Sequence, residues 1–216
     1  DNGGTKFPTP RYTPYHVPHR TEVAGFMTIL HGDARFYNNI FVQAKVREDL
    51  KGYVQSRNLD ALSFYNFICG TKPYDGYPDP KTYFGQFNAQ STSDFGSKDL
   101  FYDHLPVYTG GNVYFNGAQP CDTEENFASY TEHEITWELD LENDHCVFKT
   151  NVYDFMPEIH APLDNTELLG EAFEPEQKFE APDGSSILFD TDYLGEKRPL
   201  QPMPGPFSQE RNIQEL

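Results

Sequence analysis

The chain has 216 residues, a formal net charge of −18 and 37% hydrophobic residues. The charge argues against nucleic-acid binding and docking to anionic membranes, which need basic surfaces, and the apolar runs are too short to span a bilayer. The 14 Tyr and 18 Phe can bury large areas, so we expect an ordered domain, alone or with an appendage.

Three widely spaced cysteines, Cys69, Cys121 and Cys146, come without a Cys-x-x-Cys motif or a His/Cys cluster. We therefore expect reduced, partly buried thiols and neither a metal nor a cofactor. This cysteine usage suits a cytoplasmic protein, with secretion as the alternative. No secretory leader is visible, and the first five residues are typical of the middle of a loop.

The N-terminal part begins with residues 1–22, which are expected to form a loop because four prolines keep the segment extended. The apolar run at 23–30 predicts a strand. Residues 35–42 predict one coil of a right-handed parallel β-helix, in which Asn38 and Asn39 hydrogen-bond neighbouring coils. One coil cannot bury its own apolar face, and few coils are visible here. The chain is therefore expected to be the end of a larger solenoid.

In the middle of the chain, apolar residues near helical spacing predict a short surface helix within 44–60. Residues 70–106 are rich in Gly, Pro and aromatic residues and predict a long irregular excursion of the kind that serves a site or an interface. A second coil-type strand is expected at 113–117, where it ends in an Asn-Gly turn.

The C-terminal part is predicted to be antiparallel. Strand candidates precede an extended surface tail at 196–216, and they lie at 134–139, 146–152, 166–169 and 186–190. The alternation of Ile135, Trp137 and Leu139 predicts a one-sided strand with Trp137 in the core, and the alternative for this residue is stacking on a sugar. The fold class is therefore all-β, with terminal β-helix coils and long loops in residues 1–120 and a small antiparallel β cap with the tail in residues 121–216.

Three motifs in chain order carry a resemblance to a known family. They are TPYHVPHRTEVAGF at 13–26 with GDARFYNNIF at 32–41, NVYFNGA at 112–118, and FEAPDG at 179–184 with DTDYL at 190–194. In these motifs the chain resembles the C-terminal third of the glycoside hydrolase family 120 β-xylosidases. One departure is Ala34, because the family tends to have a second acidic residue at that position.

The resemblance implies a right-handed β-helix hydrolase that removes xylose from xylo-oligosaccharides with retention of configuration, a role in xylan degradation. Retention needs two carboxylates about 5–5.5 Å apart. In the family both lie N-terminal to the matched region, so no catalytic residue is assigned to this chain. The resemblance then implies a partner, an N-terminal β-helix chain that carries the catalytic acid pair. We expect this chain to be inactive alone and to act in a heteromer or a higher oligomer.

The proline-bearing loop provides the candidate substrate-binding residues, which are Tyr15, His16, His19, Arg20 and Glu22. Their polar groups would hydrogen-bond sugar hydroxyls at the mouth of the cleft. The alternative is a polar loop that only pins this segment to adjacent coils. Two histidines without further ligands do not predict a metal site.

Other side chains have simpler interpretations. Asp33 and Arg35 are expected to form an ion pair within the coil. The acidic residues of the pairs Glu124-Glu125 and Glu174-Glu176 are expected to be solvated. A second candidate for a sugar platform is the set of aromatic residues Tyr74, Tyr77, Tyr83 and Phe84.

Two other functions stay open at this point. A non-catalytic carbohydrate-binding or assembly module would use the same β layer and aromatic loops. A β-helix end cap on a polysaccharide lyase is the third possibility. The sequence has no nucleophile elbow, phosphate-binding Gly loop or dinucleotide fingerprint that would indicate another chemistry.

Overall fold

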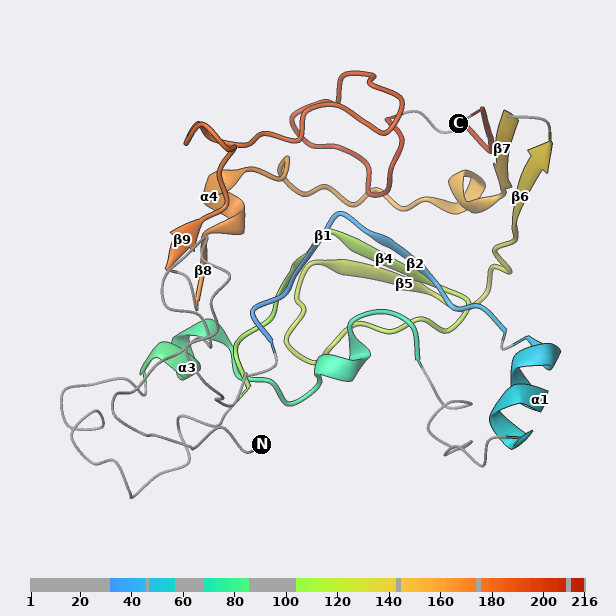
Figure 1. Ribbon diagram of the computed structural model, residues 1–216, viewed down its shortest axis with the longest axis horizontal. Helices are drawn as coiled ribbons and strands as arrows, with labels where there is room; N and C mark the ends of the chain where they lie inside the picture. Colours follow the sequence, from blue (N-terminus) through green and yellow to red (C-terminus); the bar gives the residue numbers. More distant parts are fainter. Residues whose placement is uncertain are drawn as a thin grey trace, which may run out of the picture. The chain divides into compact units, whose positions relative to one another are not determined.

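The computed structural model describes residues 32–45, 47–56, 68–85, 104–142, 145–173, 176–208 and 211–215 (Figure 1). These residues form small β-sheets and irregular segments with a few short helices. The predicted all-β class is confirmed at this level. The described strands do not close into a complete solenoid, so the right-handed β-helix stays a prediction.

The chain divides into two compact units, each assembled from three separate segments. Unit 1 comprises Asp1–Arg35, Tyr77–Tyr108 and Asp164–Leu188. Unit 2 comprises Phe36–Gly76, Thr109–Leu163 and Phe189–Leu216. Both units draw on residues from either side of position 120. These two units do not decide the division into coils (residues 1–120) and cap (residues 121–216), which stays a prediction.

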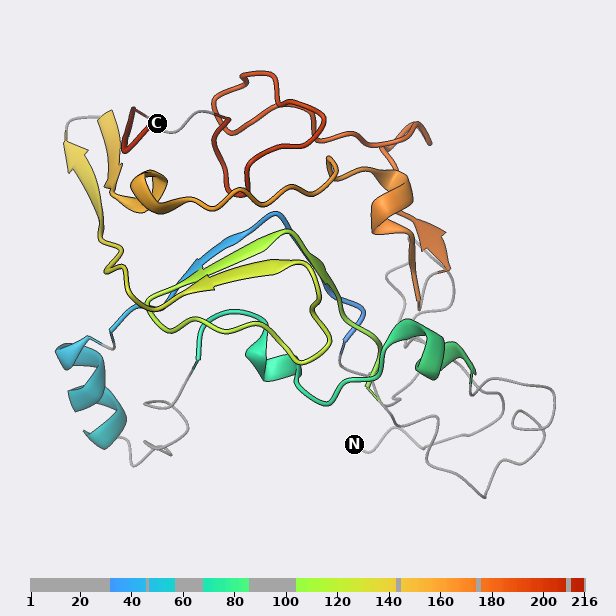
Figure 2. The same ribbon diagram turned by 180° about the vertical axis from the view of Figure 1, so that it is seen from behind.

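Three parallel strands form the central sheet of unit 2. They are β2 (Ile40–Val42), β4 (Asn112–Phe115) and β5 (Phe127–Tyr130), with β4 in the middle (Figure 2). Val113 of β4 lies opposite Ile40 of β2. The middle strand is buried along its whole length, as is typical of parallel strands covered on both faces.

A second pair of strands has one member directly before β2 in the chain and the other directly before β4. It consists of β1 (Arg35–Tyr37) and β3 (Tyr108–Gly110). The corner after β1 is Asn38 and the corner after β3 is Gly111, with left-handed φ angles of 55° and 69°. A Cβ on Gly111 would lie 2.5 Å from the Cβ of Ala161, so this corner requires glycine. The segment predicted as one coil is therefore two short strands joined at a fixed corner.

One face of the central sheet supplies the hydrophobic core of unit 2. Val113 and Phe115 pack with Ile135, Val152, Tyr153, Ile159 and Phe207. Phe207 is only 3% exposed although it belongs to the tail. The prediction of a surface tail is wrong at this residue, because its ring packs in the hydrophobic core of unit 2.

An antiparallel sheet of unit 2 has the order β6–β7–β10 and consists of β6 (Trp137–Glu142), β7 (His145–Thr150) and β10 (Ile213–Glu215). The hairpin of β6 and β7 confirms two of the predicted strands, with β6 starting three residues later than predicted. The third strand comes from the tail, for which no strand was predicted.

Two other predicted strands are wrong. Residues 166–169 form the short helix α4 (Thr166–Leu169), because the side chain of Asn165 accepts the N–H groups of Glu167 and Leu168 and so caps its first turn. Residues 186–190 form isolated bridges and no strand. Unit 1 instead contains a two-stranded sheet of β8 (Glu171–Ala172) and β9 (Gln177–Lys178).

The remaining helices are short. The predicted surface helix is confirmed as α1 (Glu48–Ser56), and the excursion at 70–106 contains α3 (Pro80–Gly85). Single 3-10 turns occur at Lys72–Tyr74 and Val152–Phe155. In the part of the chain that the structure describes, no helix has the length and apolar character needed to cross a bilayer. The strand predicted at 23–30 lies outside the described residues.

Candidate functional site

The five substrate-binding residues predicted from the sequence all lie outside the described residues. They are Tyr15, His16, His19, Arg20 and Glu22. Their role stays a prediction. The described residues contain three other groups of polar side chains, namely an ion pair in unit 1, a buried carboxylate network in unit 2 and an open groove in unit 2.

The ion pair of unit 1 joins Arg35 to Asp33, with Nη1 2.7 Å from Oδ1 and with side chains only 7% and 18% exposed. This confirms the pairing predicted from the sequence. Arg35 also donates from Nε to the Leu169 carbonyl (2.7 Å) and from Nη2 to the Glu171 carbonyl (2.8 Å). Oδ2 of Asp33 accepts the N–H of Phe173 at 2.9 Å. Both side chains therefore fix a distant segment of unit 1 and are not placed to act on a substrate.

The guanidinium of Arg35 also lies over two aromatic rings. Its Cζ atom is 4.6 Å from the ring centre of Tyr108 and 4.8 Å from that of Phe179. A cation over an aromatic face is stabilised by the ring quadrupole. Phe179 begins the third sequence motif and Arg35 lies in the first, so this contact joins two of the segments that carry the family resemblance.

A carboxylate is buried in unit 2. Glu124 is 5% exposed and accepts hydrogen bonds from Asn112 Nδ2 (2.7 Å), the Tyr114 hydroxyl (2.6 Å) and the Thr71 hydroxyl (3.1 Å). Burial raises the pKa of the Glu124 carboxyl above its ordinary value, and the three donors partly offset this effect. The prediction of a solvated acidic pair is wrong for Glu124 and right for Glu125, which is exposed.

The same network continues from β4 to the segment that joins β1 and β2. Oδ1 of Asn112 accepts both the backbone N–H of Asn39 (2.9 Å) and its side-chain Nδ2 (3.0 Å), while Asn112 Nδ2 also donates to the Phe36 carbonyl (2.7 Å). The predicted ladder role is confirmed for Asn39. Asn38 lies at the corner, where its Nδ2 donates to the Pro162 carbonyl at 3.1 Å. The network is structural, because its polar atoms satisfy one another.

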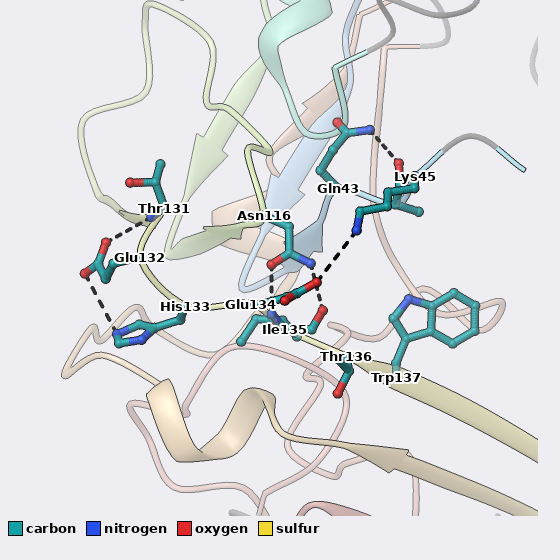
Figure 3. Close-up of a pocket in the computed structure, with 11 residues that line it drawn as sticks. Gln43, Lys45, Asn116, Thr131, Glu132, His133, Glu134, Ile135, Thr136 and Trp137 are labelled. Carbon is teal, nitrogen blue, oxygen red and sulfur yellow. Dashed lines mark hydrogen bonds and ion pairs between the residues drawn. The ribbon is translucent and has the colours of Figure 1, made fainter.

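An open groove of about 630 Å³ lies in unit 2. One wall is formed by residues 131–137, which lead into β6, and the other by the segment after β2. Figure 3 shows Trp137 at one end of the row of labelled side chains, Glu132 and His133 at the other end, and Lys45 on the opposite wall.

The groove combines fixed and adaptable polar groups. The Asn116 side chain makes two hydrogen bonds to the backbone of Ile135, each 2.8 Å long: Nδ2 donates to the carbonyl, and Oδ1 accepts the N–H. This clamp fixes one wall of the groove. Lys45 Nζ lies 3.7 Å from Glu134 Oε1, and the two side chains are 97% and 80% exposed. Such an exposed ion pair contributes little to stability. Each of the two groups can therefore leave its partner and bind a ligand instead.

A search among proteins of known structure finds one match over nearly the whole chain. The chain is similar to XylC. With the structure of XylC in complex with xylose it shares 27% identity and a TM-score of 0.70, over 94% of this chain. The chain spans 29% of the length of the XylC chain. No protein-family model and no curated protein match the chain.

Trp137 is 59% exposed, so the prediction that it belongs to the core is wrong. The buried member of the alternating set is Ile135, which precedes the strand and is 4% exposed. Trp137 and Leu139 lie on one face of β6, which is the edge strand of its sheet among the described residues, and that face is largely uncovered. The alternation therefore correctly predicted that Trp137 and Leu139 lie on the same face of the strand. It did not predict that this face would be exposed to solvent.

The aromatic excursion does not form the predicted platform as a whole. Tyr83 is fully buried and packs edge-on against Phe173 at 5.7 Å. Tyr77 stacks flat on His104 at 4.1 Å. Only Phe84, 46% exposed, presents much of its ring to solvent. The platform prediction is therefore wrong for Tyr83.

The side chains of the described residues are better suited to binding a ligand than to carrying out a reaction on it. Among them, no group of three or more His, Cys, Asp or Glu side chains is placed to hold a metal ion. Cys69, Cys121 and Cys146 are free thiols, and burial raises the pKa of the Cys69 thiol. The groove presents an exposed indole, an ammonium and carboxylates, and this combination is suited to binding a polar ligand with one flat apolar face.

Proposed function

We propose that this chain is the C-terminal part of a retaining β-xylosidase-like glycoside hydrolase that acts on xylo-oligosaccharides. The observation that carries the proposal is the similarity to xylose-bound XylC, at 27% identity over 94% of the chain. A likeness over nearly the whole chain supports shared chemistry better than a shared fold alone would. The three sequence motifs point to the same family.

The proposal includes a right-handed parallel β-helix of which this chain forms the terminal coils. Its support is the parallel pairing of β2, β4 and β5, the Asn39–Asn112 ladder and the two left-handed corners. A strand, a corner and a second strand form the kind of unit that a solenoid stacks. Residues 1–120 would then provide the coils and cleft-lining loops, and residues 121–216 the β cap and tail.

We also propose that a separate N-terminal chain supplies the catalytic carboxylate pair. Glu124 is occupied by three donors, and Asp33 is occupied by Arg35 and a backbone N–H. Glu132 and Glu134 have side chains 60% and 80% exposed, whereas glycosidase carboxylates work in a cleft that excludes water. Of the described carboxylates, these four do not suit the reaction.

The substrate would then be held between the two chains. Tyr15, His16, His19, Arg20 and Glu22 are our proposed contacts to the sugar from this chain. Imidazole, guanidinium and carboxylate groups bind sugar hydroxyls by directed hydrogen bonds. These residues would contribute to substrate affinity and not to bond cleavage.

The purified 216-residue chain alone is expected to release no xylose from 4-nitrophenyl β-xyloside or xylobiose, because the acid pair is missing. The protein isolated from its source is expected to contain a second β-helix polypeptide in equal amount by intact-mass measurement. That complete protein should release β-xylose first, as followed by proton NMR of the anomeric signal.

A matched pair of variants makes the test sharper. In the complete enzyme, His16→Ala is expected to raise KM at least several-fold with a smaller change in kcat, and His160→Ala on an exposed position is the control. Xylose release by the chain alone would overturn the split arrangement. A complete protein that binds xylan but releases no xylose would indicate the non-catalytic module instead, and unsaturated products absorbing in the ultraviolet would indicate a lyase.

A further inference from the structure

We propose that the groove beside Trp137 is a binding site for a neutral xylo-oligosaccharide chain. The site lies wholly in unit 2 and uses Trp137 as a stacking platform, with Lys45 and Glu134 as partners for sugar hydroxyls. The choice of xylose as the sugar rests on the proposed function. The geometry itself points to an extended, uncharged sugar.

The first argument is the exposed indole. Trp137 is the only tryptophan of the chain, and more than half of its surface faces solvent. Its indole N–H has no hydrogen-bond partner among the described residues. An indole combines a broad apolar face with a polar edge, which is why tryptophan is enriched where a partner is apolar on one side and wet on the other. A pyranose ring has this character, with axial C–H groups on its face and hydroxyls around its rim.

The second argument is the spacing of polar groups next to that indole. Lys45 and Glu134 provide one donor and one acceptor 3.7 Å apart, on opposite walls of the groove (Figure 3). Adjacent sugar hydroxyls both donate and accept, so they can replace this weak pair with two directed bonds. The Thr136 side chain, next to Trp137 in the row, is exposed and adds a hydroxyl.

The charge of the groove selects against acidic ligands. Two carboxylates, Glu132 and Glu134, line it against the single ammonium of Lys45, and the whole chain carries a formal charge of −18. A phosphate or uronate would meet like charges here. The histidine of the groove, His133, is stacked on Phe155 at 4.2 Å and lies 3.8 Å from Glu132, so it is already engaged on the wall. An uncharged sugar incurs no such repulsion.

The third argument is size and rigidity. The volume of about 630 Å³ falls within the range of about 300–1,000 Å³ that is usual for ligand sites. The groove is open at the surface, so it suits a chain that passes through it better than a single enclosed sugar. The clamp of Asn116 on Ile135 and the stacking of His133 hold the wall in place before any ligand arrives, which lowers the entropic cost of binding.

Tryptophan fluorescence gives a direct test, because Trp137 is the only indole in the chain. Adding xylotriose or xylohexaose to the protein as isolated from its source, with any partner chain still bound, is expected to change the emission of Trp137 in a saturable manner. Calorimetry should give the same affinity, tighter for the longer sugar. If a second polypeptide copurifies, the difference between wild type and Trp137→Ala isolates this signal.

The variants are chosen from exposed positions so that folding is retained, as checked by circular dichroism. Trp137→Ala is expected to weaken calorimetric binding at least tenfold, and Glu134→Gln several-fold. Leu141→Ala is the matched control, because Leu141 lies on the same strand and is 72% exposed but does not line the groove. It should bind as the wild type does.

The absence of a saturable response to both sugars would overturn the proposal, as would equal losses in Trp137→Ala and Leu141→Ala. Tighter binding of polygalacturonate than of xylohexaose would also overturn it. Because binding is measured without turnover, the result is independent of hydrolysis. A complete enzyme that hydrolyses xylosides while Trp137 shows no response would leave the proposed function intact and overturn the groove alone.

Discussion

Glu124→Ala is expected to lower the free energy of unfolding by about 3–5 kcal/mol, because three buried donors lose their acceptor at about 1–3 kcal/mol for each one left unsatisfied. The donors are the Asn112 amide and the hydroxyls of Tyr114 and Thr71. Urea unfolding of the purified protein measures the loss. Glu125→Ala is the matched control, since the neighbouring side chain is exposed and should change stability by less than about 0.5 kcal/mol. Equal effects of the two variants would contradict a buried carboxylate network.

The same residue should make stability depend on pH. Burial raises the pKa of Glu124 in the folded state above the ordinary value of 4.5, so the folded state binds this proton more tightly than the unfolded state. Its contribution is then complete below the unfolded pKa and is lost as pH rises through the folded pKa. Glu124→Gln lacks this titration. As pH rises above the unfolded pKa, the stability of the wild type should therefore fall relative to that of Glu124→Gln, and the opposite trend would contradict the raised pKa.

Arg35→Met is expected to lower the free energy of unfolding by about 2–4 kcal/mol, because it leaves the partly buried Asp33 carboxylate without its cation. The variant also removes the donors to the carbonyls of Leu169 and Glu171. Urea unfolding measures the loss. Hydrogen exchange should quicken at the Phe173 amide, which donates to Asp33.

Arg47→Met is the control for this experiment. Arg47 pairs with Asp49 at 2.6 Å, but both side chains are largely exposed, so the midpoint of unfolding should stay unchanged. Arg35→Lys is expected to recover only part of the loss, because one ammonium cannot reproduce the planar fork of the guanidinium. A similar loss in the Arg35 and Arg47 methionine variants would show that the buried pair has no special role.

The strands β1, β2 and β4 could be placed from local sequence because their signals are local. The Asn-Asn pair between an aromatic and an aliphatic run predicted a turn within one coil at 35–42, where β1 and β2 meet, and the Asn-Gly turn predicted the end of β4. The error at 166–169 has a local cause too. Thr-Glu-Leu-Leu is too short for periodicity to decide, and the local signal for a helix is the capping residue Asn165 that precedes it.

The site was less predictable because burial depends on distant partners. Glu124 looks like one more acidic residue in an exposed run, and only Asn112 and Thr71, brought together by the fold, make it a buried acceptor. The alternation around Trp137 says which residues share a face. It does not say which face other segments will cover, and here they cover Ile135 and leave the indole in solvent.

The central sheet has a consequence for the order in which the molecule assembles. Asn39, directly before β2, bonds to Asn112 of β4, which is 73 positions away in sequence, whereas only residues 116–126 separate β4 from β5. Loop-closure entropy makes the distant pairing the slower step. We therefore expect β4 and β5 to pair before β2 joins the sheet.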